Sequence, residues 1–438
     1  MTDIMTLASR PDWKLYRLGQ LFRERKEKGS DKDFPPLSVT MGGIVPQLET
    51  AAKTDDGDNR KLVRVGDYVI NSRSDRKGSG GISDHEGSVS LISIVLEPRN
   101  IDPRFAHHLL RSRAFQEEFY RWGHGIVADL WTTRYGDMKN IRLRVPDLDT
   151  QRQIADFLDR ETARIDLLIE KKRRFLEVLA QKWAATVTFK LANGLNPGAP
   201  KIHSGVSWIG EIPKHWRVTK LGHIGRSANG INIGGDAFGS GFPFVSYGDV
   251  YRNPELPLNV AGLVQSSAED RARYTLKAGD VLFTRTSETI DEIGFSSVCT
   301  EDIPEAVFAG FLIRFRPIKS KLLPSFSKFL FRNEQLRAFF SKEMMIVTRA
   351  SLSQGLLQRM PVVLPPIEEQ EEIAQHLQKA EDTFLAVSEH TNTSINCLKE
   401  YRSALITAAV TGQIDVQTYA RSGMADCRLE TIQEETEA

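Results

Sequence analysis

The chain has 438 residues, of which 40% are hydrophobic and 26% are charged, and its formal net charge is +1. This composition is typical of a globular protein with two or three domains and excludes a disordered or collagen-like chain. No apolar run reaches the roughly 18 residues that a membrane-spanning helix needs, so no membrane partner is expected.

The three cysteines, Cys299, Cys397 and Cys427, lie far apart and form no CxxC pair. This pattern fits a reducing compartment and offers no metal site. The first residues contain no apolar segment of signal-peptide length. We therefore expect a cytoplasmic protein.

Residues 1–145 form a mildly basic block of short strands and turns, with 24 lysines and arginines against 20 acidic residues. Gly66-Asp67 precedes a short apolar strand, which runs into a loop rich in Gly and Ser. Small residues let backbone N–H groups approach phosphates, and an arginine fork can pair with guanine. The candidate nucleic-acid contacts of this block are Arg73, Arg76, Lys77, Thr133 and Arg134. An ordinary solvated loop is an equally good interpretation of each.

Residues 146–194 predict one long helix with a heptad pattern. The segment opens with proline, acidic residues and Gln151, and it ends at Gly194, as a helix C-terminus often does. Apolar residues at spacings of three, four or seven predict a coiled-coil stripe. The stripe consists of Ile154, Leu158, Ile165, Leu168, Phe175 and Leu179.

Residues 195–364 predict a linker followed by a second basic block that resembles the first. Its Trp216, Leu221 and Gly222 repeat Trp13, Leu18 and Gly19, and Gly279-Asp280 repeats Gly66-Asp67. The strand after Gly279-Asp280 runs into Arg285, which we take as the counterpart of Arg73. The candidate contacts of this block are Tyr247, Thr284, Arg285, Thr348 and Arg349, with core packing or a solvated loop as the alternative for each.

Residues 365–416 repeat the long helix. Pro365, Gln370, Ile373 and Leu377 follow their counterparts in the first copy at a constant offset, and this copy ends at Gly412. Its predicted stripe consists of Ile373, Leu377, Phe384, Val387, Leu398 and Leu405. Residues 417–438 are acidic with few apolar side chains, which predicts a disordered tail.

The order block, helix, block, helix predicts an α+β protein with an internal pseudo-two-fold axis. Two similar mixed α/β domains are then joined by two long antiparallel coiled-coil helices. Two independent helices in a repeat array are the alternative. The drifting offset between the blocks implies insertions, so that the blocks share a fold and not a surface.

The chemistry of an enzyme is not apparent in the sequence. The string Asp33-Phe34-Pro35-Pro36 has the wrong order for the Asn/Asp-Pro-Pro-aromatic loop of an adenine methyltransferase. There is no GxxxxGK[ST] phosphate loop, no HExxH pair and no nucleophile–base arrangement. The sequence therefore predicts binding without catalysis, and neither a metal nor a cofactor on this chain.

These features together resemble the specificity subunits of type I restriction–modification systems. The likeness rests on the doubled Pro-acidic-Gln-Ile-Ala-x-x-Leu openings (Pro146–Leu158 and Pro365–Leu377), the glycine ends, the two Trp…Leu-Gly entries and the two Gly-Asp strand starts. It covers the chain from Trp13 to about Val416.

The resemblance implies that residues 1–145 and 195–364 are target recognition domains, each of which reads one half of a bipartite, asymmetric site in double-stranded DNA. It implies that the helices at 146–194 and 365–416 act as spacers and as docking surfaces for two modification subunits. Those subunits carry S-adenosylmethionine and methylate adenine. Whether motor-nuclease restriction subunits also bind stays open, as do the recognised bases, the spacer length and the adenine that is modified.

A coiled-coil scaffold that binds only proteins is the main alternative function. It explains the helices but not the paired basic blocks. The salt dependence of DNA binding distinguishes the two, because phosphate contacts weaken steeply as salt rises.

Overall fold

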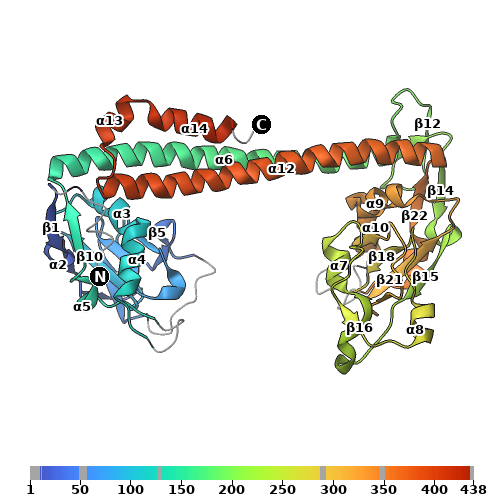
Figure 1. The fold of residues 1–438 in the computed structure, drawn as a ribbon, viewed down its shortest axis with the longest axis horizontal. Coiled ribbons are helices and arrows are strands. Elements are labelled where there is room, and N and C mark those ends of the chain that lie inside the picture. The colour runs from blue at the N-terminus through green and yellow to red at the C-terminus, as the bar shows by residue number, and fades with distance from the viewer. Residues whose placement is uncertain are drawn as a thin grey trace. The chain divides into compact units, whose positions relative to one another are not determined.

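The computed structural model describes residues 10, 12–48, 57–125, 131–286, 293–344 and 351–434. The chain divides into two compact units, each built from distant parts of the sequence. Unit 1 comprises residues 1–174 and 389–438, and unit 2 comprises residues 175–388. Figure 1 shows that each unit contains one block and parts of two long helices.

The two predicted long helices are α6 (Leu148–Asn193) and α12 (Ile367–Val410), of 46 and 44 residues. Within each unit their segments run side by side in opposite directions (Figure 1). In unit 1 the Arg402 guanidinium donates to both oxygens of Asp166 at 2.9 and 3.0 Å. In unit 2 the Trp183 ring stacks on Phe384 with 5.8 Å between centroids. The α+β fold with paired long helices is thus confirmed.

The heptad stripe is buried most completely where the helices lie against their blocks. In α6, Ile154, Leu158 and Ile165 are buried, whereas Leu168 and Leu179 are half-buried. Phe175 is 48% exposed, so its side chain does not lie in a buried seam as the heptad pattern predicts. In α12, Phe384 and Val387 are half-buried, and the buried stripe residues are Ile373, Leu377, Leu398 and Leu405.

The two blocks share one frame of strands. In unit 1 a four-stranded antiparallel sheet has the order β2-β10-β7-β8, and in unit 2 the order is β15-β21-β18-β19. The bounds in unit 1 are Phe22–Glu24, Ser93–Pro98, Tyr68–Asn71 and Gly80–Ile82. Those in unit 2 are Gly225–Asn229, Leu312–Pro317, Val281–Thr284 and Ser296–Val298. The strands correspond one to one, which supports the predicted duplication.

A second strand pair joins the two ends of each block. β1 (Lys14–Arg17) pairs with β11 (Arg142–Val145), and β14 (Arg217–Lys220) pairs with β22 (Pro361–Leu364), both antiparallel. The frame is completed by three helices in each block: α3 (Pro103–Arg111), α4 (Arg113–Arg121) and α5 (Tyr135–Met138), then α9 (Pro324–Arg332), α10 (Glu334–Met344) and α11 (Gln354–Arg359). Short elements α2 (Leu18–Leu21) and the 3-10 turn at Leu221–His223 follow β1 and β14.

The Gly-Asp motifs begin equivalent frame strands. Gly66 and Gly279 have φ of +88° and +89°, a left-handed conformation that glycine adopts without steric cost. The carboxylate of Asp67 accepts the backbone N–H of Arg64, and that of Asp280 accepts the N–H of Lys277, at 2.8 and 2.9 Å. The same turn therefore sets the register of β7 and β18.

The blocks differ in the segment between the first and second frame strands in chain order, which we call the insert (residues 25–67 and 230–280). The insert of block 1 contains β3 (Lys28–Gly29), β4 (Leu37–Thr40), β5 (Gly43–Pro46) and β6 (Arg60–Val63). That of block 2 contains β16 (Phe238–Val245), α7 (Tyr247–Arg252), β17 (Leu263–Val264) and α8 (Ala268–Arg273). Outside the inserts, β9 (Gly87–Val89) pairs with β6 and β20 (Val307–Phe308) pairs with β16. The two inserts thus have different topologies on one frame.

Each block has a core that reaches beyond the frame. In unit 2, one cluster of buried side chains includes Trp216 and Phe326 of the block with Val187 of α6 and Leu377 of α12, so the helices belong to the same core. A second cluster, around Phe244 and Phe308, lies under the insert. In unit 1, Leu37 and Ile44 of the insert pack with Val69 and Val95 of the frame.

The tail predicted to be disordered instead contains two helices, α13 (Val416–Arg421) and α14 (Met424–Glu434). Asp415 caps α13 by accepting the Thr418 N–H. The few apolar residues lie on one face of α14, where Leu429 and Ile432 are 3% and 1% exposed. The prediction was wrong because it weighed average composition and not helical spacing; it still stands untested at residues 435–438, which lie outside the described part.

The linker after α6 forms a hairpin of β12 (Lys201–His203) and β13 (Glu211–Pro213) in unit 2. In the described part of the chain, none of the helices has the length and apolar character needed to cross a bilayer.

Candidate nucleic-acid interface

The basic loop of block 1 follows β7, and a hydrogen bond and an ion pair fix its conformation. The Asn71 side chain accepts the Arg73 N–H at 3.0 Å, and Lys77 forms a 2.8 Å ion pair with Glu117 of α4. Lys77 also lies 5.3 Å from the centroid of the Tyr120 ring. The side chains of Arg73, Arg76 and Lys77 are all exposed. The loop thus presents these three cations to solvent from a fixed backbone.

Thr133 and Arg134 lie beside this loop but differ in their accessibility. Thr133 is fully buried, its hydroxyl donates to the Phe119 carbonyl at 2.9 Å, and its N–H donates to the Ser72 carbonyl. A DNA contact of the Thr133 side chain would require the hydroxyl to leave this hydrogen bond. Arg134 is exposed just before α5 and remains a candidate.

In block 2, Thr284 and Arg285 end β18 and begin the following loop. Thr284 is fully buried and its Oγ1 accepts the Phe295 N–H at 2.9 Å, so its hydroxyl anchors the backbone. Arg285 is half-buried, and its N–H and carbonyl bond to Phe311 and Leu352. Its guanidinium Nε is buried without a hydrogen-bond partner among the described residues.

The backbone pairing shows that Arg285 is not the counterpart of Arg73. Ser72 donates to the carbonyl of Ile92 and accepts from Thr133, as Arg285 does with Phe311 and Leu352. Arg73 instead bridges to Thr132, as Thr286 bridges to Ser351. Successive residues of a strand point to opposite faces. The two arginines are therefore one position apart, and the predicted equivalence was wrong.

Tyr247 begins α7 in the insert of block 2 and is half-buried. Its ring stacks on Tyr251 with 6.0 Å between centroids and an interplanar angle of 17°. Ser246 caps α7 through its hydroxyl, which accepts the Asp249 N–H. Thr348 and Arg349, the remaining candidates, lie outside the described residues.

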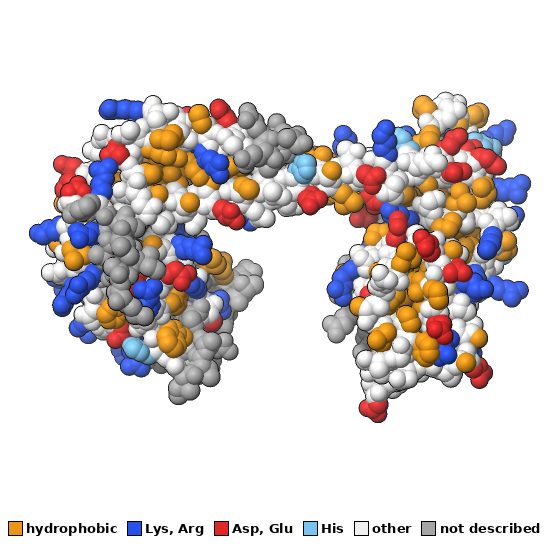
Figure 2. All heavy atoms as spheres, viewed as in Figure 1, with side chains coloured by type: hydrophobic (Ala, Val, Ile, Leu, Met, Phe, Trp, Pro, Cys, Tyr) orange, Lys and Arg blue, Asp and Glu red, His pale blue; other side chains and the backbone are white. Residues whose placement is uncertain are grey.

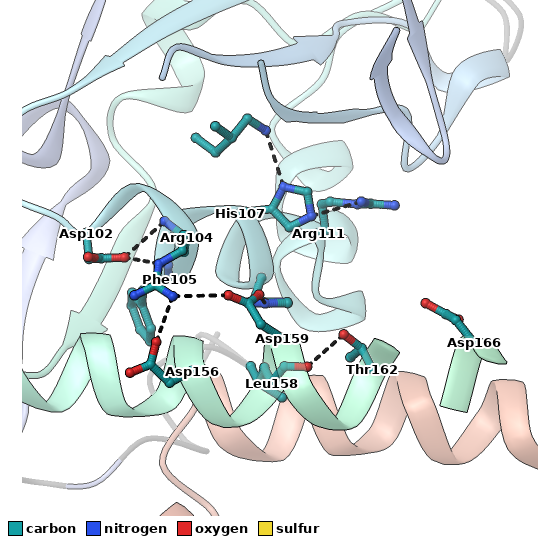
Figure 3. A network of polar contacts seen from close by, with 12 residues as sticks. Asp102, Arg104, Phe105, His107, Arg111, Asp156, Leu158, Asp159, Thr162 and Asp166 are labelled. Atoms are coloured by element: carbon teal, nitrogen blue, oxygen red, sulfur yellow. Dashed lines mark hydrogen bonds and ion pairs between the residues drawn. The ribbon is translucent and has the colours of Figure 1, made fainter. Parts of the chain in front are cut away.

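The side chains that fix block 1 on α6 could not be recognised in the sequence. Figure 3 shows Arg104 of α3 reaching Asp156 and Asp159 of α6, at 2.6 and 3.4 Å. His108 Nε2 lies 2.7 Å from Asp159 Oδ1, and the His108 pKa is lowered because burial outweighs the attraction of Asp159. The Pro-x-Phe spacing of α3 predicted a helix but not its ionic contacts.

His107 and Arg111 lie on another side of α3 (Figure 3). The Arg111 guanidinium lies 3.0 Å from His107 Nε2 and also donates to the Met41 carbonyl. Burial and the neighbouring Arg111 charge lower the pKa of His107 to about 3, so the imidazole is neutral at physiological pH. A neutral imidazole accepts through one nitrogen only, and Arg111 cannot accept. The 3.0 Å contact therefore assigns the acceptor to Nε2, and the 3.3 Å contact of the Ile82 N–H with Nδ1 is not a full hydrogen bond.

Arg332 of α9 occupies the position of Arg111 in block 2. Its guanidinium donates to the carbonyls of Ser296, Val250 and Tyr251 at 2.7, 2.8 and 3.1 Å. Burial, together with the nearby Arg337 charge, lowers its pKa to about 10. The repeat of Arg111 as Arg332 was visible in the sequence, but its role was not, because the partners are backbone carbonyls.

Neither metal-binding side chains nor basic side chains gather at one place in the described residues. No group of three or more His, Cys, Asp or Glu side chains there could hold a metal ion. On the face drawn in Figure 2, Lys and Arg side chains are scattered over each unit among acidic ones. The candidate contacts are thus short loops and one helix of the blocks, and not one broad basic patch.

The comparisons with known proteins agree with this architecture. The family described as "Type I restriction modification DNA specificity domain" matches residues 213–396, which include the second block and much of α12. Together with the fold, this match shows that the chain is similar to the DNA specificity subunits of type I restriction–modification systems.

Curated relatives match this chain at low identity. The specificity subunit of the type I restriction enzyme EcoKI from Escherichia coli is 23% identical over 81% of this chain and 76% of that protein. The putative MjaX specificity subunit from Methanocaldococcus jannaschii is 28% identical over 46% of this chain, but the match spans only 48% of that protein.

Solved structures share the fold. One, described as the structural basis of complex assembly and conformational transition of the type I R-M system, matches with a TM-score of 0.72 at 17% identity over 93% of this chain and 99% of that chain. The HsdS subunit from Thermoanaerobacter tengcongensis matches with a TM-score of 0.50 at 19% identity, over 93% and 98% of the two chains.

Proposed function

We propose that this chain is the DNA specificity subunit of a type I restriction–modification system. In this role it reads a bipartite, asymmetric site in double-stranded DNA, with one half-site for each block. The recognition domains are residues 1–145 and 195–364, and the spacer helices are residues 146–194 and 365–416. The observation that carries the proposal is that the two blocks share one strand order and differ in their inserts. A common frame gives both blocks the same way of meeting a duplex, whereas different inserts present different side chains to the bases.

The proposed partners are two modification subunits that dock on the paired helices. S-adenosylmethionine is then bound by those subunits, which methylate adenine, and this chain binds no cofactor. Motor-nuclease restriction subunits can join such a complex where they are present. One of the solved structures with the same fold is described in terms of complex assembly of the type I R-M system, and this description supports an assembly of this kind.

The proposed DNA contacts in block 1 are the exposed cations Arg73, Arg76, Lys77 and Arg134. Those in block 2 are the half-buried Arg285 and Tyr247. An arginine fork pairs with guanine, and a tyrosine can contact a base or a phosphate. Thr133 and Thr284 remain in the set only as backbone anchors beside these side chains, since both hydroxyls already form buried hydrogen bonds. Thr348 and Arg349 stay predictions without structural support.

Mapping of methyl-adenine in genomic DNA tests the proposal. Cells express this chain with its modification subunit, and the control cells lack this chain. A split motif of two unlike half-sites that disappears in the control supports the function. Replacement of residues 1–145 by another recognition domain should change one half only. An assembled, active complex that gives no motif would instead favour a scaffold that binds only proteins.

Arg285→Ala gives a finer test at one half-site. It should weaken methylation at the half-site of block 2 and leave subunit assembly unchanged, because the backbone hydrogen bonds of Arg285 go to Phe311 and Leu352 of the block and not to α6 or α12. Unchanged site choice with unchanged assembly would remove Arg285 from the set of contacts.

A further inference from the structure

The last residue of the first frame helix is an arginine in both blocks. Arg111 ends α3 and Arg332 ends α9, and the next residue, Ser112 or Asn333, accepts a backbone N–H at the start of the following helix. The two arginines therefore occupy equivalent positions in the two frames. Each side chain is half-buried and turns away from the helix caps toward the insert.

In block 2, Arg332 joins the frame to α7 of the insert. It donates to the Val250 and Tyr251 carbonyls, which lie at the C-terminal end of α7, and to the Ser296 carbonyl of the frame strand β19. A cation at the C-terminus of a helix satisfies carbonyls that lack partners within the helix. One side chain thus connects the frame helix, the frame sheet and the insert.

A series of contacting aromatic rings extends from this site to Tyr247, the candidate DNA contact. The Tyr251 ring lies 4.8 Å from Phe295, which the guanidinium of Arg337 covers at 3.8 Å, and it stacks on Tyr247. Because Arg332 holds the Tyr251 backbone, it also fixes the surface on which the Tyr247 ring lies. A shift of α7 would move Tyr247 with it.

In block 1 the equivalent arginine contacts a turn of the insert and not a helix. Arg111 donates to the carbonyl of Met41, in the turn between β4 and β5 of the insert. The Met41 side chain is 70% exposed, so this turn forms part of the outer surface of the block. The frame residue is the same in both blocks, whereas the insert that it holds is a hairpin turn in one and a helix in the other.

We infer that Arg111 and Arg332 are positioning residues for half-site recognition. Each holds the insert of its own block in one orientation on the shared frame. Arg332 thereby determines where Tyr247 lies, and Arg111 determines where the exposed β4–β5 turn at Met41 lies. The inference rests on the proposed function, since it assigns the reading of each half-site to one block. The arginines themselves need not touch DNA.

Conservative variants test this role. Arg332→Lys keeps the charge but cannot donate to three carbonyls in the fork geometry of a guanidinium. The measurement is the affinity of the assembled complex for duplexes with single base changes in either half of the mapped motif. We expect Arg332→Lys to reduce discrimination at the half-site of block 2 by at least about 5-fold and to leave discrimination at the other half-site unchanged. Arg111→Lys should give the opposite pattern.

Arg217→Lys is the matched control, because Arg217 is an exposed arginine on β14 of the frame. Thermal unfolding of each variant is measured in parallel. A purely structural role would lower the unfolding temperature and weaken both half-sites together, and this result would overturn the inference. So would unchanged discrimination at both half-sites in folded variants. If Arg332→Lys does not fold, Arg111→Lys tests the same statement in block 1.

The wild-type complex separates this inference from the proposed function. If the wild type shows no bipartite motif, the proposed function fails and the variants have no half-site to change. If the wild type shows the motif and neither lysine variant changes one half selectively, only the positioning role fails.

Discussion

Gln151 and Gln370 make the same pair of hydrogen bonds at the start of the two long helices. The Nε2 group donates to the carbonyl of Pro146 or Pro365, at 2.8 or 3.0 Å. The Oε1 atom accepts the N–H that precedes the first frame helix, from Asp102 at 2.8 Å or from Leu323 at 3.0 Å. One buried amide thus joins the last frame strand, the first frame helix and the long helix in each unit.

Gln370→Leu should destabilise unit 2. The leucine fills a similar volume but leaves the Leu323 N–H and the Pro365 carbonyl without their partner, at a cost of about 2 kcal/mol. Urea unfolding should therefore shift to lower concentration. Gln375→Leu on the exposed face of α12 is the control and should change stability little. Equal effects of the two variants would contradict the role of the buried amide.

Gly412→Ala should destabilise unit 1 more than Gly423→Ala. Both glycines have positive φ, +71° and +67°, so both variants carry the same backbone strain of about 1 kcal/mol. Only at position 412 would the new Cβ meet a ring, with Trp13 Cζ2 at 3.0 Å, whereas nothing lies within 4 Å at position 423. The difference in unfolding free energy between the variants measures that contact. If the two variants have the same unfolding free energy, the Trp13 ring moves aside without a cost in stability.

Leu429→Ala in the tail should lower the stability of unit 1 by about 2 kcal/mol, because a nearly fully buried leucine is lost. The tail is also tied to the helices by contacts of Arg164 with Asp426 and of Gln153 with Gln417. Met424→Ala is the matched control, since Met424 is 49% exposed on the same helix. Limited proteolysis offers a second measurement: the variant should be cleaved in residues 422–434 faster than the wild type. Identical cleavage and stability would indicate that α14 is not packed in solution.

The stability of unit 1 should fall as the pH is lowered below about 6.5. The pKa of His107 is about 3 in the folded protein, whereas an unfolded histidine titrates near 6.5. The unfolded chain therefore binds a proton that the folded chain does not, and its contribution to stability, fully present above pH 6.5, declines by up to about 1.4 kcal/mol per pH unit between pH 6.5 and 3.

His107→Gln tests this pH dependence, because glutamine can still accept from Arg111 but does not titrate. Its unfolding free energy should change less steeply with pH over this window than that of the wild type. His203→Gln, at an exposed histidine on β12, should keep the wild-type slope. A wild-type slope in His107→Gln would place the titration elsewhere, with the buried His108 as the next group to examine.

The sequence by itself determined the duplicated architecture of this protein. The order block, helix, block, helix, the lengths of α6 and α12 and the glycine ends all followed from repeats and heptad spacing, which depend on local patterns. The Gly-Asp strand starts followed for the same reason, because a left-handed glycine and a carboxylate that accepts a nearby N–H are local interactions.

Only the tertiary structure decided which residues are buried and what they contact. Arg73 lies seven residues after Gly66 and Arg285 only six after Gly279, so counting from the Gly-Asp repeat already separates them by one position. The strand register confirms that offset and places their side chains on opposite faces. Thr133 and Thr284 look like polar loop residues, but their hydroxyls are buried. The composition of the tail predicted disorder, whereas the structure shows that one apolar face of α14 is enough to hold the helix against the rest of unit 1. Arg111 and Arg332 acquire their role from carbonyls of distant segments, and contacts of this kind depend on how the chain folds back on itself and not on the residues nearby in sequence.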